Sequence, residues 1–318
     1  MPSILTHCFF AEDVKKELEY GSFFSLLQKH DKLYQFASNG PDLFFFYGFW
    51  PWVSKKEADT IKRYGSLLHT YLANELFTTL FAHVKESGNE EEIACVCGII
   101  CHWALDSTIH PFVYSVVGKG TKKNSMRHRQ LERTWDGELL VKRGMSRAYC
   151  PCDKLLRDET SLRPLHRLYD TVITELWQTK LPFDKFRKAV KDYDCLERLL
   201  YDPNQWKRPL LEFAETLVGR KGYISTMIIN QKNRIPWDIR NAEGQKWVHP
   251  VTNEIHTESL EQLYDIATKK AVGLITLLER YLQQTASRNQ IEEFVRNRSF
   301  STDTEDTEMR YFSLRQSE

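Results

Sequence analysis

The sequence predicts an all-α fold, organised as a single multi-helix domain over residues 1–290. Three observations lead to this prediction. Apolar residues recur at three- and four-residue steps through most of the chain, which is the period of an amphipathic helix. The alternating pattern of a half-buried strand is scarce. Residues that favour helix starts precede several of the periodic segments. With 318 residues, 42% of them apolar, the chain can bury a large core.

The first long helix is expected over residues 56–86, where apolar positions repeat with the helical period. These positions are Ile61, Tyr64, Leu67, Leu68, Tyr71, Leu72, Leu76 and Leu80. A second helix is expected over residues 90–109, because Asn89 and the glutamates after it favour a helix N-terminus. This helix is expected to stop near His110, since Pro111 disfavours the helical conformation at the residue before it.

The same periodicity predicts further helices downstream. They are expected over residues 123–143, 160–180, 183–201, 207–219 and 258–285. The last of them begins with the pattern Ser259-x-x-Gln262, which fits a capping box at a helix N-terminus.

Three segments depart from the helical pattern. Residues 43–52 form an aromatic run with Pro51 near its end, interpreted either as a buried wall or as a wall that contacts an apolar or stacking ligand. Residues 220–256 have weak periodicity, so we expect a long irregular excursion, for which a flap over a site is one role. The chain then turns polar after about residue 290, and residues 291–318 are expected to form a disordered tail.

The overall composition excludes several broad classes of protein. With 44 basic and 43 acidic residues, the chain has no general attraction to nucleic acid or to an anionic membrane. The N-terminal residues lack the pattern of a secretory signal, and no uninterrupted apolar run reaches about 18 residues, so no transmembrane segment is expected. Seven cysteines, an odd number, indicate reduced thiols and a cytoplasmic location. The pair Cys150 and Cys152 could bind metal, but it lacks the second pair of a zinc knuckle.

The strongest chemical signal is a row of metal-ligand residues in the second predicted helix. His102, Asp106 and His110 are spaced four residues apart, so on a helix they share one face, with about 5–6 Å between Cβ atoms. The residues between them are mostly apolar, which indicates a buried face. An unpaired polar group buried there costs on the order of 1–3 kcal/mol. A metal ion would supply the missing partner.

Other residues of ligand type extend this set. His128 and Glu132 repeat the spacing of four on the next predicted helix, while His69 lies among leucines, Asp42 follows a Gly-Pro turn and His7 stands near the start. Each has an ordinary explanation: a hydrogen-bonded core histidine, a turn or cap residue, a surface pair. Together they predict a metal cluster. Imidazole and carboxylate ligands without thiolate suit zinc, or less often manganese or iron.

In chain order, these residues resemble the motifs of the zinc-dependent phospholipase C family, which shares its helical fold with the S1/P1-type nucleases. The residues that carry the resemblance are His7, Asp42 in Gly-Pro-Asp, His69, His102, Asp106, His110, His128 and Glu132. The resemblance implies an all-α domain of the phospholipase C and P1 nuclease type. It also implies a cofactor of two or three zinc ions.

The resemblance further implies a role for each residue. One zinc ion would be held by Asp42, His69, His102 and Asp106. A second would be held by His110, His128 and Glu132. His7 would help to hold a third, with Asp106 as the bridging ligand. Asp42 would also be the candidate catalytic residue, acting as a general base near the attacking water.

The expected activity is therefore zinc-dependent hydrolysis of a phosphodiester by a metal-activated water, with a small phosphoester or a phospholipid head group as the partner. A nuclease acting on single strands is an alternative that the aromatic run at 43–52 supports, although the balanced charge predicts no stable nucleic-acid complex. A metal-stabilised scaffold without catalysis is the other alternative. Some residues of the 220–256 excursion either line the site or are solvated: Asn230, Asn233, Arg234, Arg240, His249 and His256.

Overall fold

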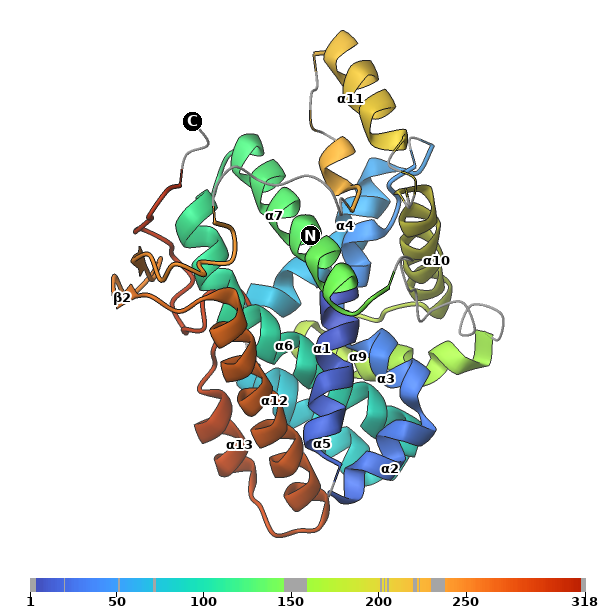
Figure 1. Ribbon diagram of the computed structural model, residues 1–318. Coiled ribbons are helices and arrows are strands. Elements are labelled where there is room, and N and C mark those ends of the chain that lie inside the picture. The colour runs from blue at the N-terminus through green and yellow to red at the C-terminus, as the bar shows by residue number, and fades with distance from the viewer. Residues whose placement is uncertain are drawn as a thin grey trace.

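A computed structural model of the chain describes residues 4–19, 21–50, 52–70, 73–145, 159–200, 202, 204, 206–219, 222, 224–229 and 238–315. The all-α prediction is confirmed (Figure 1). The α-helices are α1 (Ile4–Glu17), α2 (Ser22–Lys29), α3 (Asp31–Ala37), α4 (Lys55–Thr70), α5 (Ala73–Ser87), α6 (Glu90–Val117), α7 (Lys122–Lys142), α9 (Arg163–Trp177), α10 (Phe183–Leu200), α11 (Lys207–Leu217), α12 (Leu260–Leu282) and α13 (Arg288–Val295). The shorter elements are the 3-10 helices η1 (Gly40–Phe46), η2 (Glu159–Leu162) and η3 (Ser225–Met227), and the strands β1 (Trp247–Val248) and β2 (Ile255–His256).

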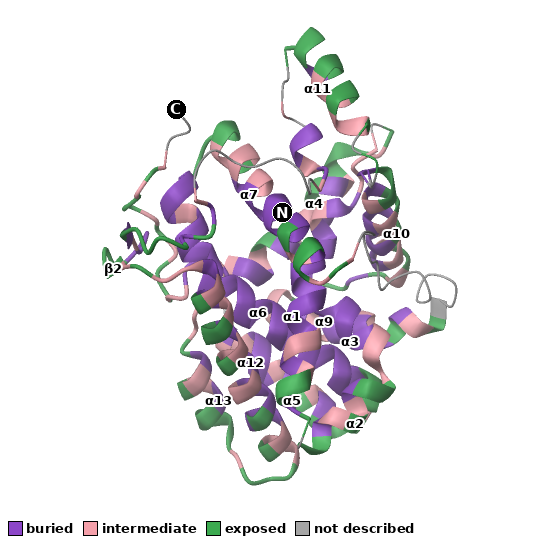
Figure 2. Cartoon of the chain, viewed as in Figure 1, coloured by how far each residue is buried: buried purple, intermediate pink, exposed green. Residues whose placement is uncertain are grey.

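Helix α6 forms the centre of the structure, and α12, α3, α1 and α7 all pack against it. Nearly all of its side chains are buried, as the purple ribbon in Figure 2 shows. By length and composition alone, α6 could cross a membrane, but 94% of its most apolar window is buried inside the protein. Burial of this extent is typical of a helix in the core of a folded protein.

The start of α6 agrees with the prediction, whereas its end does not. The side chain of Asn89 caps the helix by accepting hydrogen bonds from the backbone amides of its first turn. The prediction that the helix stops near His110 is wrong, because α6 continues through Pro111 to Val117. A proline inside a helix costs about 3 kcal/mol. The turn after it buries Phe112, Val113, Val116 and Val117. Each such side chain contributes about 1.5–3 kcal/mol, so packing outweighs the cost.

The other predicted helices are confirmed with small changes at their ends. The segment predicted as one helix over 56–86 is helical on both sides of Tyr71 and Leu72, as α4 and α5, and those two residues lie outside the described residues. The capping box at the start of α12 is present. Gln262 donates its backbone amide to the side chain of Ser259 and accepts from the Ser259 amide at 2.8 Å.

The aromatic run at 43–52 forms the 3-10 helix η1 and the turn that follows it. Phe44, Phe46 and Tyr47 are buried, which supports the interpretation as a buried wall for this part of the run. Trp52 is different, because 74% of its surface is exposed, and its ring stacks on that of Trp50 at 4.9 Å between centroids. The run therefore combines a buried wall with an exposed ring, Trp52, that stacks on the half-buried ring of Trp50.

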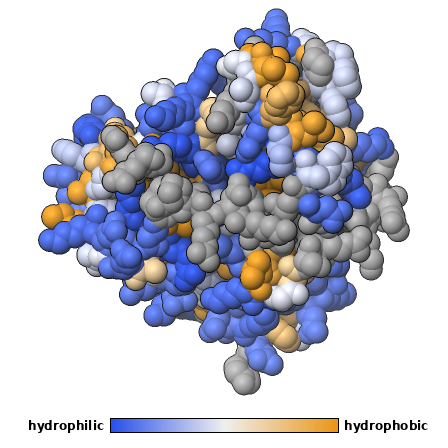
Figure 3. Space-filling model, turned by 45° about the horizontal axis from the view of Figure 1, so that its top comes forward, coloured by the Kyte–Doolittle hydropathy of each residue, from blue (hydrophilic) through white to orange (hydrophobic). Residues whose placement is uncertain are grey.

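The described part of the excursion at 220–256 is mostly irregular, as predicted. It contains η3 and a small antiparallel pair in which Trp247 of β1 faces His256 of β2. Before it, helix α11 exposes three apolar side chains: Leu210, Phe213 and Leu217. This helix stands at the top of Figure 1, and hydrophobic surface gathers at the top of the space-filling view (Figure 3).

The prediction of a disordered tail over 291–318 is wrong for residues 291–315. Helix α13 extends to Val295, and the chain after it packs along α6. The indole of Trp103 donates to the carbonyl oxygen of Arg298 at 2.9 Å, and Ser313 donates its amide to the carbonyl oxygen of Ser115 at 2.9 Å. The buried ring of Phe300 adds an apolar anchor. Composition does not reveal such anchors, because they depend on partners almost 200 residues earlier in the chain.

Candidate metal centre

Helix α6 brings His102, Asp106 and His110 together on one buried face, as the spacing of four predicts. Oδ2 of Asp106 lies 3.2 Å from Nε2 of His102 and 3.6 Å from Nδ1 of His110. Asp106 thus stands between the two histidines as the shared carboxylate of the row.

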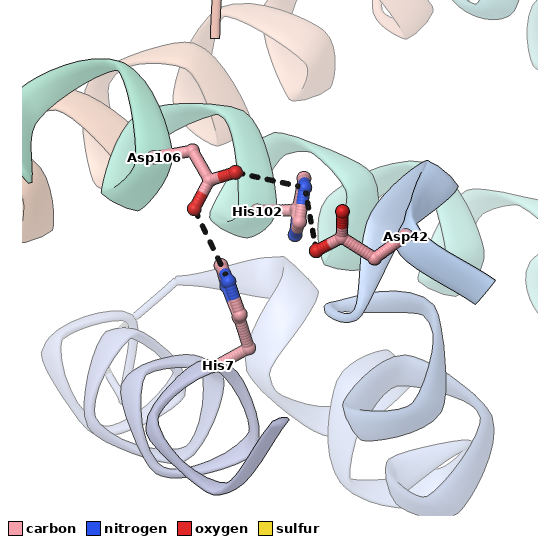
Figure 4. Close-up of side chains that lie close together, drawn as sticks. All are labelled: His7, Asp42, His102 and Asp106. Carbon is pink, nitrogen blue, oxygen red and sulfur yellow. Dashed lines mark ion pairs between the residues drawn. The ribbon is translucent and has the colours of Figure 1, made fainter. Parts of the chain in front are cut away.

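Helix α1 brings His7 to the same carboxylate from the opposite side (Figure 4). Nε2 of His7 lies 3.2 Å from Oδ1 of Asp106, and the His7 ring stacks on that of His102 at 4.3 Å between centroids. The neighbouring residue fixes this end of α1. Thr6 donates both its amide and its hydroxyl to Oδ1 of Asp136 on α7, at 2.9 and 2.8 Å.

Asp42 reaches these residues from the first turn of η1. One ligand atom from each of His7, Asp42, His102 and Asp106 lies within 4.8 Å of the others, and with His69 they form the first cluster. Its Oδ1 lies 3.0 Å from Nε2 of His69 on α4, and its Oδ2 lies 3.6 Å from Nε2 of His102. The approach depends on Gly40, whose φ is +56° and where an added Cβ would lie 2.3 Å from the ring of His102. Only glycine combines this left-handed conformation with such close contact. The Gly-Pro-Asp turn therefore places the carboxylate of Asp42 beside the ring of His102.

Three of the histidines are oriented by backbone carbonyl groups. Nδ1 of His69 lies 2.6 Å from the carbonyl oxygen of Gly65, Nδ1 of His102 lies 3.1 Å from that of Ser38, and Nδ1 of His110 lies 3.0 Å from that of Phe300. Since a carbonyl oxygen only accepts, each Nδ1 carries the proton. In the neutral ring Nε2 then presents a lone pair. Metal-ligating histidines are oriented in this way.

A second cluster combines His110 with two residues of α7. Nε2 of His128 lies 2.8 Å from Oε1 of Glu132, and Nε2 of His110 lies 3.5 Å from the same oxygen. One ligand atom from each of the three residues lies within 4.8 Å of the others. His128 and Glu132, four residues apart on α7, therefore belong to a buried cluster and are not a surface pair.

Several polar atoms of the two clusters are fitted for a cation. Oδ2 of Asp42, Oδ2 of Asp106 and Oε2 of Glu132 are buried without a hydrogen-bond partner among the described residues. Leaving a buried acceptor unsatisfied costs about 1–3 kcal/mol, and more for a charged one. A bound metal ion removes this penalty. The ligands are imidazole and carboxylate without thiolate, which suits zinc.

The electrostatics of the site favour the protonation states that metal binding requires. Burial would raise the pKa of Asp106, but its histidine neighbours, His110 foremost, outweigh burial and hold that pKa well below its usual range. Burial lowers the pKa of His102 and of His128, which keeps both rings neutral. Metal ligands bind as ionised carboxylates and neutral imidazoles, so these groups are prepared for an ion.

Two histidines are exceptions. Burial lowers the pKa of His7, but the charge of Asp106 and the hydrogen bond to it outweigh burial and raise that pKa. His110 is the second exception. Burial lowers its pKa, but the carboxylates of Asp106 and Glu132 outweigh burial and raise the pKa to about 9. Without a metal ion, His110 carries a proton at neutral pH, and an ion that binds there displaces it.

A small cavity of about 20 Å³ lies between the two clusters, which is room for about one water molecule. Its lining includes members of both clusters and apolar side chains: Thr6, His7, Leu105, Asp106, Ile109, His110, Val113, Leu131, Glu132 and Trp135. An apolar lining around a few polar groups strengthens electrostatic interactions inside it.

The structure thus brings together all eight residues that the sequence predicts as ligands. It also adds residues that sequence reasoning missed. Tyr114 packs on His128 and His110 at 5.0 and 5.6 Å between centroids. Tyr114 lies four residues after His110, so the helical spacing alone could have predicted that the two residues share a face. Phe300 and Asp136 gave no local signal, because their roles depend on distant partners.

The residues of the 220–256 excursion find partners elsewhere. Arg240 forms an ion pair with Glu261 at 2.5 Å, Nε2 of His249 lies 2.9 Å from the carbonyl oxygen of Thr302, and His256 stacks on Trp247. None of these contacts joins them to a predicted ligand. Asn230, Asn233 and Arg234 lie outside the described residues, as do Cys150 and Cys152.

Comparisons with known proteins agree with this geometry. The model of the family described as zinc dependent phospholipase C matches residues 6–198, which include all eight predicted ligands. Searches of curated proteins and of solved structures found no match. The family match and the buried histidine–carboxylate clusters support a zinc-dependent phosphoesterase. Since the match covers more than half of the chain, the protein belongs to the zinc-dependent phospholipase C family.

Proposed function

We propose that this protein hydrolyses a phosphodiester in the manner of a phospholipase C, with a small phosphoester or a phospholipid head group as its substrate. The observation that carries the proposal is the cluster of His110, His128 and Glu132 beside a small cavity. Three protein ligands leave a fourth zinc position for water or substrate, which is typical of catalytic sites and not of structural ones.

Two or three zinc ions fit the two clusters. Asp42, His69, His102 and Asp106 would hold one, and His110, His128 and Glu132 a second, while His7 and Asp106 would share in a third. Zinc held there would polarise phosphoryl oxygens and would lower the pKa of a water molecule enough for it to act as the nucleophile at neutral pH.

Asp42 is the proposed general base. Its carboxylate is buried at the edge of the first cluster, and Oδ2 has no hydrogen-bond partner among the described residues. An ionised carboxylate in that position accepts the proton from the attacking water. Nε2 of His69 lies 3.0 Å from Oδ1 of Asp42.

A nuclease acting on single strands is the second candidate, and one observation favours it. Trp50 and Trp52 stack in nearly parallel planes at 13°, and Trp52 is largely exposed. Exposed aromatic rings of this kind stack on unpaired bases. The balanced net charge of +1 argues against a stable nucleic-acid complex. The non-catalytic scaffold is the less favoured alternative, because its zinc ions would need closed coordination spheres.

The first experiment is elemental analysis of protein purified without chelator. We expect two or three zinc ions per chain, and a loss of at least one in Asp106→Asn, because Asp106 contacts both clusters. The matched control is Asp170→Asn. Asp170 belongs to neither cluster and accepts a hydrogen bond from the amide of Leu181, so the zinc content of this variant should be unchanged. A folded wild-type chain that holds no zinc, and takes none up in titration, would overturn the proposal.

Substrate assays then separate the candidates. We expect cleavage of bis(4-nitrophenyl) phosphate and release of phosphocholine from phosphatidylcholine micelles. Faster cleavage of a single-stranded oligonucleotide than of either would favour the nuclease. Retained zinc without activity on any of the three would favour the scaffold.

We also propose a cytoplasmic location. The cysteines of the described part are free thiols, and Cys8, Cys95, Cys97 and Cys101 are buried. Reduced thiols fit that compartment. Fractionation of cells that produce the protein, with a cytoplasmic and a membrane marker, tests this.

A further inference from the structure

Residues 297–303 follow α13 and run across the metal-bearing part of α6; we refer to them as the C-terminal strap. They lie about a hundred residues beyond the segment 6–198 that the family model matches. In Figure 1 the red end of the chain climbs from α13 toward the end of α6. None of the eight predicted ligands lies in the strap, but the strap contacts three of them.

The first contact fixes His110. The carbonyl oxygen of Phe300 accepts the Nδ1 proton of His110 at 3.0 Å. Oδ2 of Asp106 also lies 3.6 Å from this Nδ1, but the shorter contact is to the carbonyl group. As a result the ring keeps its proton on Nδ1 and turns Nε2 toward Glu132. Nε2 is the nitrogen that the second cluster requires.

The second contact concerns His69 and His102. The amide of Phe300 donates to the carbonyl oxygen of His69 at 3.2 Å. The phenyl ring of Phe300 packs on the rings of His69 and His102, with centroids 5.2 and 5.7 Å away, and it is only 1% exposed. One residue of the strap therefore packs on ligands of both clusters and closes one side of them with an apolar ring.

Anchors at both ends hold the strap in place. Asn297 and Asn74 exchange side-chain and backbone hydrogen bonds at 2.8 and 3.2 Å. At the other end, Lys270 of α12 pairs with Asp303 and donates to the hydroxyl of Ser107 at 2.8 Å. Ser107 adjoins Asp106 in α6. Lys270 therefore links the strap to α6, the helix that carries three of the ligands.

We propose that Phe300 is a positioning residue, and that the C-terminal strap is a built-in part of the metal centre that sets the orientation of His110 and shields His69 and His102. This inference rests on the proposed function, because it assumes that the two clusters hold zinc. It extends that function to a part of the chain outside the family match. Hydrogen-bond partners of metal-ligating histidines commonly change metal affinity by about 10- to 100-fold when altered.

The test compares Phe300→Ala with Phe300→Leu and with Phe294→Ala as the matched control. Phe294 is a partly buried phenylalanine of α13 that packs against Gly273 of α12. Three properties are measured on the full chain: zinc affinity by competition with a chelator, thermal stability, and the visible absorption spectrum with cobalt in place of zinc.

Phe300→Ala keeps the backbone carbonyl group but removes the ring that packs the strap against His69 and His102, so the hydrogen bond from His110 loses its support. We expect the affinity for at least one zinc ion to fall about 10- to 100-fold and the cobalt spectrum to change. Phe300→Leu, which refills most of the volume, should restore both. Phe294→Ala should lower stability and leave the spectrum unchanged. A loss of stability alone is what a merely structural role would give, so the spectrum is the deciding measurement.

A folded Phe300→Ala variant with wild-type affinity and spectrum would overturn the role of the strap. If that variant does not fold, Asp303→Asn serves instead, since it weakens the anchor to Lys270 without touching Phe300. An unchanged spectrum there would likewise overturn it. A wild-type chain that binds neither zinc nor cobalt would defeat the proposed function itself, which is a different result.

Discussion

Nε2 of His69 and Nε2 of His102 lie 3.3 Å apart inside the protein. Both rings donate Nδ1–H to backbone carbonyl groups, of Gly65 and Ser38. In the neutral state two lone pairs therefore face each other inside the protein. Lone pairs repel at this distance. A cation between them would remove the repulsion, because each Nε2 would coordinate it. The pair is the clearest sign that the fold is built around an ion.

Removal of metal should therefore destabilise the protein. A ligand that binds only the folded state stabilises it by about 4 kcal/mol when present at a thousand times its dissociation constant. We expect chelation to lower the melting temperature by several degrees and zinc, added back, to restore it. Differential scanning calorimetry with and without a chelator measures this. Equal melting temperatures would contradict a resident metal.

Gly40→Ala should disrupt the first cluster. The new Cβ would lie 2.3 Å from the ring of His102, and the left-handed conformation adds about 1–2 kcal/mol of strain. Gly88→Ala is the matched control, because Gly88 has a φ of +58° and nothing lies within 4 Å of its added Cβ. We expect Gly40→Ala to lose both stability and zinc, and Gly88→Ala to lose only the strain energy. Equal losses in the two variants would show that contact with His102 is unimportant.

Thr6→Val should weaken the placement of His7. The hydroxyl of Thr6 donates to Oδ1 of buried Asp136 at 2.8 Å, and its removal costs about 1–2 kcal/mol. We expect a lower content of the zinc ion that His7 helps to hold, measured by elemental analysis after dialysis. Thr268→Val on α12, whose hydroxyl bonds to the backbone of its own helix, is the control and should retain full zinc content.

Zinc affinity should rise with pH. His110 has a pKa raised to about 9 in the metal-free protein, since Asp106 and Glu132 favour its charged form over burial. Below that pH, each ion that binds there must displace a proton, so affinity rises about tenfold per pH unit between pH 6 and 8. Calorimetric titration in buffers of different ionisation enthalpy would count the released proton. A pH-independent affinity would contradict the assignment of His110.

His110 also makes the stability of the metal-free protein depend on pH. Its contribution to stability falls as pH rises, whereas zinc affinity increases. The pKa of His110 is raised above the unfolded value of 6.5. Its charged form therefore contributes stability that is fully present below about pH 6.5 and is lost as pH rises through about 9. Thermal melts of chelated protein across this range, compared between wild type and His110→Gln, should show this difference shrinking with rising pH.

The sequence by itself determined the helical fold and the local part of the metal centre. A spacing of four residues places His102, Asp106 and His110 on one face of α6, and His128 beside Glu132 on α7, because helix geometry alone decides which residues are neighbours. The order of the ligand residues was enough to indicate the family. Helix starts were equally local, since Asn89 and Ser259 cap the residues that directly follow them.

Only the tertiary structure decided how distant segments meet. His7, Asp42 and His69 come from three elements, and no periodicity could place them within about 4 Å of His102 and Asp106. Pro111 was misleading for a related reason: local propensity favoured a helix end, while the burial of the following turn outweighed it. The tail was misjudged because its polar composition hides Phe300, whose carbonyl and ring reach ligands about 190 and more residues away in the chain. Local rules follow from covalent geometry, whereas these contacts depend on the packing of the whole chain.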